Sequence, residues 1–222
     1  MTPVGLTREL IAMRVAKELR DGMAVNLGIG LPTLVANFLP PGETVYLHAE
    51  NGILGYGGII DDDSRWDQDQ ISAGGQPVEL IPGACFFDSA QSFAMIRGGH
   101  LDITVLGGLQ VSAKGDLANW SVPERKGGAI GGAMDLAAGA RRVIAAMEHV
   151  TRDGEPRILE RCTYPLTATG CVDLVVTNLA VIAVTPEGLV LRETAPGVSV
   201  DGVQAATGAK LIVPQDVKEM EL

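Results

Sequence analysis

The chain has 222 residues, of which 46% are hydrophobic and 20% are charged, and its formal net charge at pH 7 is −10. This composition excludes overall disorder, and a chain of this length can bury a substantial core, so we expect a single domain over residues 1–222. No run of basic residues occurs, which argues against nucleic acid and anionic membrane surfaces as partners.

Neither the cysteines nor the histidines have the spacing of a metal site. Cys85, Cys162 and Cys171 form no CxxC pair, and we expect them to be reduced and buried, as in a cytosolic protein. A thiol nucleophile among them stays open, although no neighbouring sequence feature would activate one. No apolar stretch approaches the roughly 20 residues that span a bilayer, and charges interrupt the start of the chain, so we predict a cytoplasmic location.

The first part of the chain predicts a helix, a strand, a glycine turn and a second helix. Residues 7–20 are typical of an amphipathic helix that Thr7 caps. Residues 23–27 read as a short strand that runs into Gly28 and Gly30, after which a proline begins the second helix. Free backbone N–H groups in such a turn can hold an anion or a carbonyl oxygen. The glycine spacing matches neither the dinucleotide-binding nor the P-loop motif, so alone it supports a nucleotide site only weakly.

Two polar residues stand at the ends of apolar strands. Asn26 lies near the end of the first strand, where an amide is either a satisfied core residue or a donor in a site. Glu50 follows a second strand, residues 44–49, and precedes a glycine-rich segment, residues 51–58, that reads as a loop. Because α/β proteins bind ligands at strand ends, Glu50 is a candidate nucleophile or base. An acidic residue before Asn-Gly is more often a solvated turn residue, and the local pattern alone favours that interpretation.

The remaining segments continue the alternation of strands and helices. Strands are expected at residues 78–81, 101–106, 142–147, 172–177 and 180–184, the last in a hairpin with 188–193, and helices at 89–96 and 201–206. The acidic run at 61–69 predicts a solvated loop rather than a calcium site. The glycine-dense segment at 126–135 indicates close approach of the backbone to another group, and 217–222 should be frayed. The whole pattern predicts a three-layer α/β/α domain with a mostly parallel, mixed sheet.

Several motifs together resemble the β subunit of family I CoA-transferases, in particular the 3-oxoacid and 3-oxoadipate CoA-transferases. In the family's order they are VNLGIGLPT, AENGILGYG, GGHLDITVLGGLQVSAKGDLANW, KGGAIGGAMDL, TGCVDLVVTNLAV and ETAPGVSVDGVQAATGA. They extend from Asn26 to about Ala209, and the (S/A)ENG signature in this context is highly specific, which reverses the interpretation of Glu50. Ala49 departs from the serine that is common in the family, but that residue is not the nucleophile.

The resemblance implies a ping-pong transfer of CoA from an acyl-CoA such as succinyl-CoA to a 3-oxoacid, either acetoacetate, as in ketone body metabolism, or 3-oxoadipate. Glu50 would be the nucleophile and would carry a glutamyl-CoA thioester. The side-chain amide of Asn26 and the backbone N–H of Gly131 would bind the oxyanions, with Gly128 or Gly132 as alternatives to Gly131. CoA would be a substrate thioester, with no permanently bound cofactor and no metal.

The same resemblance implies further site residues and a partner. Gly28, Gly30, Asn51 and Gly52 would shape the surroundings of Glu50. The chain would be half of an enzyme, paired with an α subunit in a heterodimer and further in a heterotetramer. In the family the α subunit carries most CoA contacts, which fits the lack of an evident basic cluster for the CoA phosphates in this acidic chain.

Two other functions remain open. Sugar-phosphate isomerases share this type of fold and would use Glu50 as a base for proton transfer. A CoA-binding assembly subunit without catalytic activity would not need the Glu50 carboxylate at all.

Overall fold

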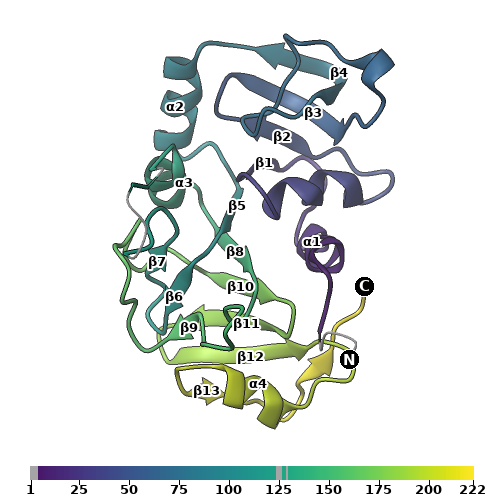
Figure 1. Cartoon of the computed structure of the whole chain (residues 1–222). Helices are drawn as coiled ribbons and strands as arrows, with labels where there is room; N and C mark the ends of the chain where they lie inside the picture. The colour runs from purple at the N-terminus through teal and green to yellow at the C-terminus, as the bar shows by residue number, and fades with distance from the viewer. Residues whose placement is uncertain (1–4, 124–126, 129) are drawn as a thin grey trace.

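The structure of the chain, a computed structural model, describes residues 5–123, 127–128 and 130–222. Lys126 and Ala129, in the predicted glycine-dense segment, lie outside the described residues. The molecule is built on a mixed sheet of 11 strands in the order β13-β12-β11-β10-β8-β5-β1-β2-β3-β4, with β14 beside β12. Figure 1 shows this sheet running through the length of the molecule, from β4 at one end to β13 at the other.

The bounds of the elements are as follows. The strands of the large sheet are β1 Ala24–Leu27, β2 Tyr46–Ala49, β3 Ile53–Ile59, β4 Val78–Phe86, β5 Ile103–Gly107, β8 Val143–Met147, β10 Leu174–Thr177, β11 Ala180–Thr185, β12 Gly188–Thr194, β13 Leu211–Ile212 and β14 Lys218–Glu219. A second sheet of three strands consists of β6 Gln110–Ser112, β7 Leu117–Ala118 and β9 Ile158–Leu159. The helices are α1 Arg8–Ala16, α2 Ser89–Arg97, α3 Ala133–Gly139 and α4 Val200–Ala206, with 3₁₀ helices at Pro32–Phe38 and Asp63–Arg65.

The middle of the large sheet is parallel and is flanked by antiparallel pairs, beyond which β13 and β14 pair in parallel with β12. Strands β2, β1, β5, β8 and β10 pair in parallel, whereas β3 and β4 on one side and β11 and β12 on the other pair as antiparallel hairpins. The parallel strands are covered on both faces, which explains their continuous apolar sequences. All five residues of β8, for example, are buried.

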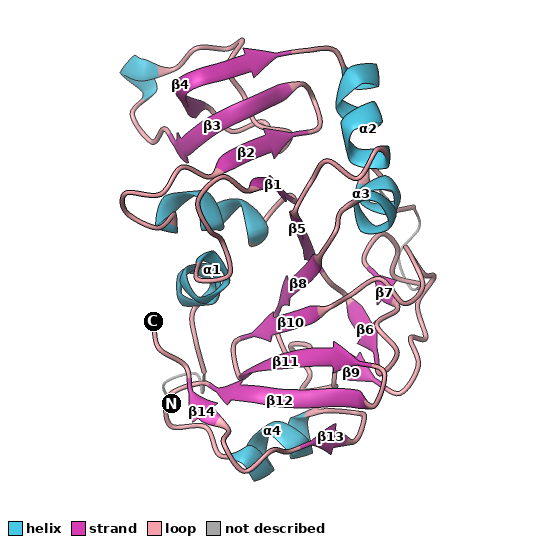
Figure 2. Ribbon diagram, turned by 180° about the vertical axis from the view of Figure 1, so that it is seen from behind, coloured by secondary structure: helices cyan, strands magenta, loops and turns pink. Residues whose placement is uncertain are grey.

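Helices cover both faces of this sheet (Figure 2). On one face α1 and the 3₁₀ helix Pro32–Phe38 share a core with the inner strands, to which Ile11 and Val35 contribute. On the other face α2, α3 and α4 pack over a second core that contains Ile96 and Leu136. The predicted three-layer α/β/α fold with a mixed sheet is confirmed.

Helix α1 ends at Ala16, about one turn before the predicted end. Thr7 caps it as predicted. The chain then continues in tighter turns, which keep Leu19 fully buried although it lies outside the helix. The guanidinium of Arg20 donates to the carbonyl oxygen of Lys17, the residue that caps the helix end, and to that of Leu19.

The prediction of a loop at residues 51–58 is wrong, because most of this segment is strand β3, which pairs with β2 and β4. Three of the glycines that suggested a loop, Gly55, Gly57 and Gly58, lie inside the strand. Gly55 has a φ of +89° where the register with β4 shifts, and a Cβ on it would lie 3.0 Å from the Cα of Ala84. Glycine here permits a bulge and a close approach of two strands, so it does not end the sheet.

The expectation of a frayed end at residues 217–222 is also wrong. Strand β14 pairs in parallel with β12, and Met220 is only 4% exposed. The Glu219 carboxylate accepts a hydrogen bond from the backbone N–H of Gly197 at 3.2 Å. One buried apolar side chain and a short ladder therefore hold this otherwise polar segment. The other predicted strands and helices are found near their expected places, although β4 extends to Phe86 and α3 begins inside the predicted glycine segment.

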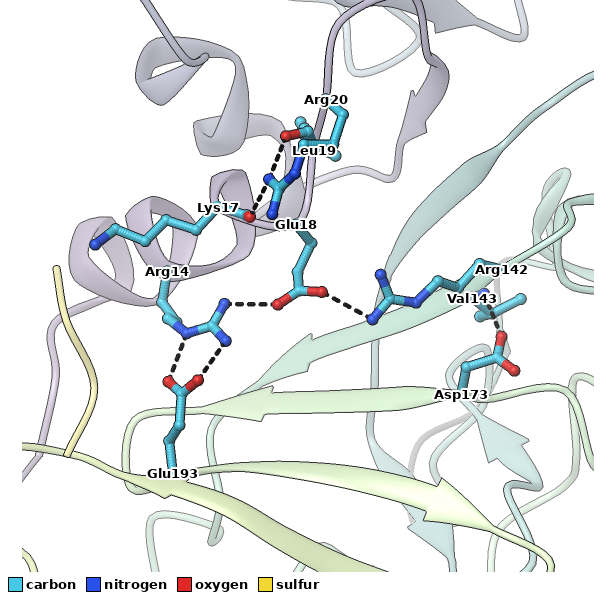
Figure 3. A network of polar contacts seen from close by, with 9 residues as sticks. All are labelled: Arg14, Lys17, Glu18, Leu19, Arg20, Arg142, Val143, Asp173 and Glu193. Atoms are coloured by element: carbon cyan, nitrogen blue, oxygen red, sulfur yellow. Dashed lines mark hydrogen bonds and ion pairs between the residues drawn. The ribbon is translucent and has the colours of Figure 1, made fainter. Parts of the chain in front are cut away.

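Four charged side chains join α1 to the sheet, and we call Arg14, Glu18, Arg142 and Glu193 the Arg14 cluster (Figure 3). Arg14 donates two hydrogen bonds of 2.7 Å to Glu193 and one of 2.8 Å to Glu18. Glu18 also accepts one from Arg142 at 2.8 Å. Burial alone would raise the pKa of the Glu18 carboxyl, but the hydrogen bonds from the two arginines outweigh it and lower that pKa. In this cluster each carboxylate is matched by a guanidinium.

Candidate active site

Glu50 lies in the turn between β2 and β3, at the edge of the sheet where the parallel strand β1 also ends. The three residues before it, which complete β2, are at most 2% exposed. The turn after it requires glycine, because Gly52 has a φ of +125° and a Cβ there would lie 2.0 Å from the carbonyl oxygen of Phe87. The sequence Glu-Asn-Gly thus holds a carboxylate at the end of a buried strand.

The Glu50 side chain lines a cavity of about 360 Å³, which we call the Glu50 cavity. Glycines form much of its wall: Gly28 after β1, Gly107 and Gly108 at the end of β5, and Gly131 and Gly132 before α3. A Cβ on Gly132 would lie 3.8 Å from the Cγ of Glu50, so this backbone passes directly beside the carboxylate. Without side chains in the way, a reacting group can approach both Glu50 and backbone N–H groups.

Asn26, in β1, is fully buried and its amide faces Glu50. Its Nδ2 donates to Oε2 of Glu50 at 3.2 Å and to the carbonyl oxygen of His48 at 3.0 Å. Its Oδ1 accepts from the Thr104 hydroxyl at 3.4 Å. Since both partners of Nδ2 are acceptors, these contacts determine which end of the amide points at the carboxylate. The structure therefore brings Asn26 and Glu50 together across 24 residues of sequence.

His48 also belongs to this arrangement, and the sequence analysis missed it. The ring is fully buried, stacks on Phe87 with the centroids 6.0 Å apart, and places Nε2 3.0 Å from the Ser92 hydroxyl and Nδ1 3.3 Å from Nδ2 of Asn26. Burial lowers its pKa to about 4, so the ring is neutral near pH 7.

We call Glu50, Asn26, His48 and Ser92 the Glu50 cluster. A histidine inside an apolar strand, two residues before the glutamate, was the signal that could have identified its third member. Ser92 lies in α2, and no feature of the sequence near Glu50 predicts that it contacts His48.

The other predicted site residues fall into two groups. Gly28, Gly131 and Gly132 line the Glu50 cavity, whereas Gly128 packs against Trp120 and is not among its lining residues. Gly30 is exposed and has a φ of +92° in the turn after β1. The Asn51 amide donates to the carbonyl oxygen of Ile71 at 2.8 Å, away from the cavity.

The thiols show no sign of activation. Cys85 is exposed on β4, the last strand of the sheet, and Cys162 and Cys171 are half-buried, which corrects the prediction that all three cysteines are buried. Burial, together with the charge of Asp116, raises the pKa of the Cys162 and Cys171 thiols to about 11, so they are protonated at neutral pH. Within the described residues no group of three or more His, Cys, Asp or Glu side chains could hold a metal ion. The helices described here are all too short or too polar to cross a bilayer.

Curated relatives share about half of the residues of this chain. It is 51% identical over 210 residues to the acetate CoA-transferase subunit beta of Escherichia coli K12, with 95% of each chain covered. It is 51% identical over 213 residues to a subunit of the 3-oxoadipate CoA-transferase of Pseudomonas putida, covering 93% of this chain and 97% of that protein. The human mitochondrial succinyl-CoA:3-ketoacid coenzyme A transferase 2 is 48% identical over 216 residues, which are 96% of this chain but 42% of the human protein. The chain thus spans about two fifths of the mammalian relatives it matches.

Solved structures of low sequence identity have the same fold. An acyl-CoA transferase of E. coli O157:H7, in a thioester complex with CoA, superposes with a TM-score of 0.74 at 20% identity, covering 100% of this chain and 44% of that chain. Glutaconate coenzyme A-transferase of Acidaminococcus fermentans gives 0.71 at 19% identity, with 98% and 90% covered. The family model described as coenzyme A transferase matches residues 8–206. These matches confirm the resemblance carried by the sequence motifs and the expected enzyme class: the chain belongs to the coenzyme A transferase family.

Proposed function

We propose that this chain is the catalytic β subunit of a CoA-transferase that moves CoA from an acyl-CoA such as succinyl-CoA to a 3-oxoacid, acetoacetate or 3-oxoadipate. The observation that carries the proposal is the 3.2 Å contact between the Glu50 carboxylate and the buried Asn26 amide, on a cavity lined by glycine backbone. The names of the relatives in P. putida and in human mitochondria support these substrates.

In the first half of the reaction, an oxygen of Glu50 attacks the acyl carbonyl carbon of the acyl-CoA. The C–S bond breaks, and CoA leaves as a thiolate from a mixed anhydride of the acyl group with Glu50. The thiolate then attacks the Glu50 carbonyl carbon, the donor acid leaves as a carboxylate, and a glutamyl-CoA thioester remains. In the second half, the carboxylate of the acceptor acid attacks that thioester, and the same steps in reverse order release the new acyl-CoA and the free Glu50 carboxylate.

The oxyanions of these steps need donors that are in place before reaction. When a thiolate or carboxylate attacks the Glu50 carbonyl, the negative charge develops on the Glu50 oxygen itself. Nδ2 of Asn26 already lies 3.2 Å from Oε2, so this donor requires no rearrangement. We assign the second donor to the backbone N–H of Gly131, which lines the same cavity.

The nature of the Asn26 contact also suits a nucleophile. A guanidinium or ammonium partner would bind the carboxylate strongly and reduce its tendency to attack, whereas a neutral amide holds the oxygen with a weaker bond. We further propose an α subunit as partner, in a heterodimer that pairs into a heterotetramer, with Glu50 near the junction of the subunits. The bacterial relatives are named as subunits of their enzymes, in E. coli as subunit beta, which supports a two-subunit enzyme.

The test is to trap the covalent intermediate. The chain and its α subunit are mixed with an acyl-CoA, quenched and digested, and the peptide that contains Glu50 is measured by mass spectrometry, with borohydride reduction as a second readout of a thioester. We expect CoA bound to Glu50 in the wild type and no adduct in Glu50→Gln. A proton-transferring isomerase would form no adduct, and a non-catalytic assembly subunit would leave the complex fully active after Glu50→Gln. A panel of acetate, acetoacetate and 3-oxoadipate then determines the preferred acceptor.

A further inference from the structure

A second cavity, of about 550 Å³, lies beside the Glu50 cavity at the same edge of the sheet. The two cavities share Ile29, Gly107 and Gly108 as lining residues, so they are neighbours with a common wall. Arg8, Arg152 and Arg157 line the second cavity, which we call the arginine cavity. Three cations at one place are unexpected in a chain with a net charge of −10. Arg152 and Arg157 share one segment, and Arg8 comes from the other end of a sequence that contains no basic run.

These three arginines have no partner among the described residues. Six of the 11 described arginines donate side-chain hydrogen bonds within the chain, mostly to carboxylates, and five do not. Three of those five are the arginines of this cavity, and the others are Arg161 and Arg192. Among the described lining residues the one carboxylate is Glu148, and it forms an ion pair with none of the three arginines. The described lining of the arginine cavity therefore carries more positive than negative charge.

The segment that carries two of the arginines is anchored in the protein interior. Arg152 and Arg157 lie in and beside a tight turn, closed by the N–H of Gly154 donating to the Thr151 carbonyl at 3.1 Å. The N–H of Arg157 donates to the carbonyl oxygen of His149 at 3.0 Å.

That histidine is fully buried, and its two ring nitrogens contact the Thr177 and Thr207 hydroxyls at 2.8 Å each. Arg8 approaches from the first turn of α1. Three separate backbone positions are thus fixed around one space.

We propose that the arginine cavity binds the phosphate groups of the acyl-CoA whose thioester end reaches Glu50. This inference rests on the proposed function. CoA carries a diphosphate and a 3′-phosphate at the end opposite its sulfur, and arginine forms charge-assisted, bidentate hydrogen bonds with phosphate oxygens. Adjacent cavities, one with the nucleophile and the other with three unpaired guanidinium groups, match the two ends of one molecule. On this proposal the chain itself, and not the α subunit alone, contacts the phosphates of CoA.

The experiment compares CoA with pantetheine, which has the same thiol arm but no phosphate. Binding of each to the reconstituted complex with the α subunit is measured by isothermal titration calorimetry for the wild type, Arg8→Gln, Arg152→Gln and Arg157→Gln. Arg192→Gln is the matched control, because Arg192 also has no described partner but lies in β12, outside both cavities. We expect each cavity variant to raise the Kd of CoA about tenfold and the control to leave it unchanged. The Kd of pantetheine should not change in any variant.

Two results would overturn the inference. One is a Kd for CoA that is the same in the three cavity variants as in the Arg192→Gln control. The other is a weakened association with the α subunit, measured by analytical ultracentrifugation, while the assembled complex keeps its affinity for CoA; the arginines would then bind carboxylates of the partner. The trapped Glu50 adduct separates this inference from the proposed function. If the wild-type enzyme forms the adduct but the cavity variants bind CoA as tightly as the control, the assignment of the arginine cavity is wrong and the proposed function stands.

Discussion

The Glu50 cluster and the Arg14 cluster both place carboxylates against nitrogen donors, but the donors differ in charge. Glu18 and Glu193 receive hydrogen bonds of 2.7 to 2.8 Å from guanidinium groups. Glu50 receives one of 3.2 Å from a neutral amide. In the first arrangement every carboxylate oxygen accepts a hydrogen bond from a guanidinium, and the bonds join α1 to the sheet. In the second, Oε1 of Glu50 accepts no hydrogen bond from the described residues, and the side chain lines a cavity.

This difference separates a structural use of glutamate from a chemical one. Charge-assisted bonds are roughly twice as strong as neutral ones, and they hold a carboxylate in its ground state. A neutral donor orients the carboxylate at lower cost to its reactivity and can still stabilise charge that develops later on the same oxygen. Substitutions in the Glu50 cluster should therefore affect turnover, and substitutions in the Arg14 cluster should affect the free energy of unfolding.

The largest effect is expected at Glu50 itself. Glu50→Gln keeps the size of the side chain and a carbonyl oxygen that can accept from Asn26, but it removes the nucleophile. We expect transfer in the reconstituted complex to fall by at least about 10⁴-fold, with the thermal unfolding midpoint unchanged. Glu50→Asp should also be severely impaired, because it withdraws the carboxylate by about one ångström from its position of attack. Wild-type turnover in either variant would show that Glu50 is not the nucleophile.

The next effect concerns the donor. Asn26→Ala removes the amide contact with Glu50 and should lower kcat by about 10²- to 10³-fold while the KM for acyl-CoA changes little. Steady-state kinetics of the complex gives the two parameters separately. Thr104→Val is the matched control, since it removes a contact of 3.4 Å to the other end of the same amide without touching Glu50. An equal loss of kcat in both variants would indicate that the amide matters for packing alone.

The sequence was sufficient to predict the parallel core of the fold and the position of Glu50, because both depend on local features. Apolar runs mark the buried strands, and Glu-Asn-Gly after such a run marks the turn. It was insufficient for β3, where glycines that permit a bulge resemble those of a loop. The sequence also could not predict which distant residues come together. The fold brings Arg8 to Arg152 and Arg157, and nothing local distinguishes these three from other surface arginines.

In the Arg14 cluster, stability should be lost without loss of chemistry. Arg14→Met leaves Glu193 without its two hydrogen bonds in a setting where the Arg14 side chain is only 9% exposed. We expect the free energy of unfolding to decrease by about 3 kcal/mol, as is typical when one partner of a buried pair is removed. Urea unfolding measures this change, and kcat per folded complex serves as the second readout. A variant with full stability and reduced kcat would reverse the roles that we assign to the two clusters.

The smallest effect that we expect is a dependence of stability on pH. It tests whether His149, a second buried histidine, contributes to the free energy of unfolding, as the Arg14 cluster does. Burial lowers the pKa of His149 to about 4 from its ordinary value of 6.5. Between these two values the unfolded chain binds a proton that the folded chain does not, so acid favours unfolding. This histidine should therefore make the free energy of unfolding fall by about 1.4 kcal/mol for each pH unit below about 6.5.

His149→Gln removes the titrating group while keeping a polar side chain near Thr177 and Thr207. Urea unfolding of both proteins at about pH 7.5, 6 and 5 gives the difference in stability, in which the titration of all other groups cancels. We expect the variant to be less stable near pH 7.5 and the difference to shrink as the pH falls. A constant difference would mean that His149 takes up its proton equally in both states. The contacts of the His149 ring with the Thr177 and Thr207 hydroxyls would then contribute the same stability at every pH measured.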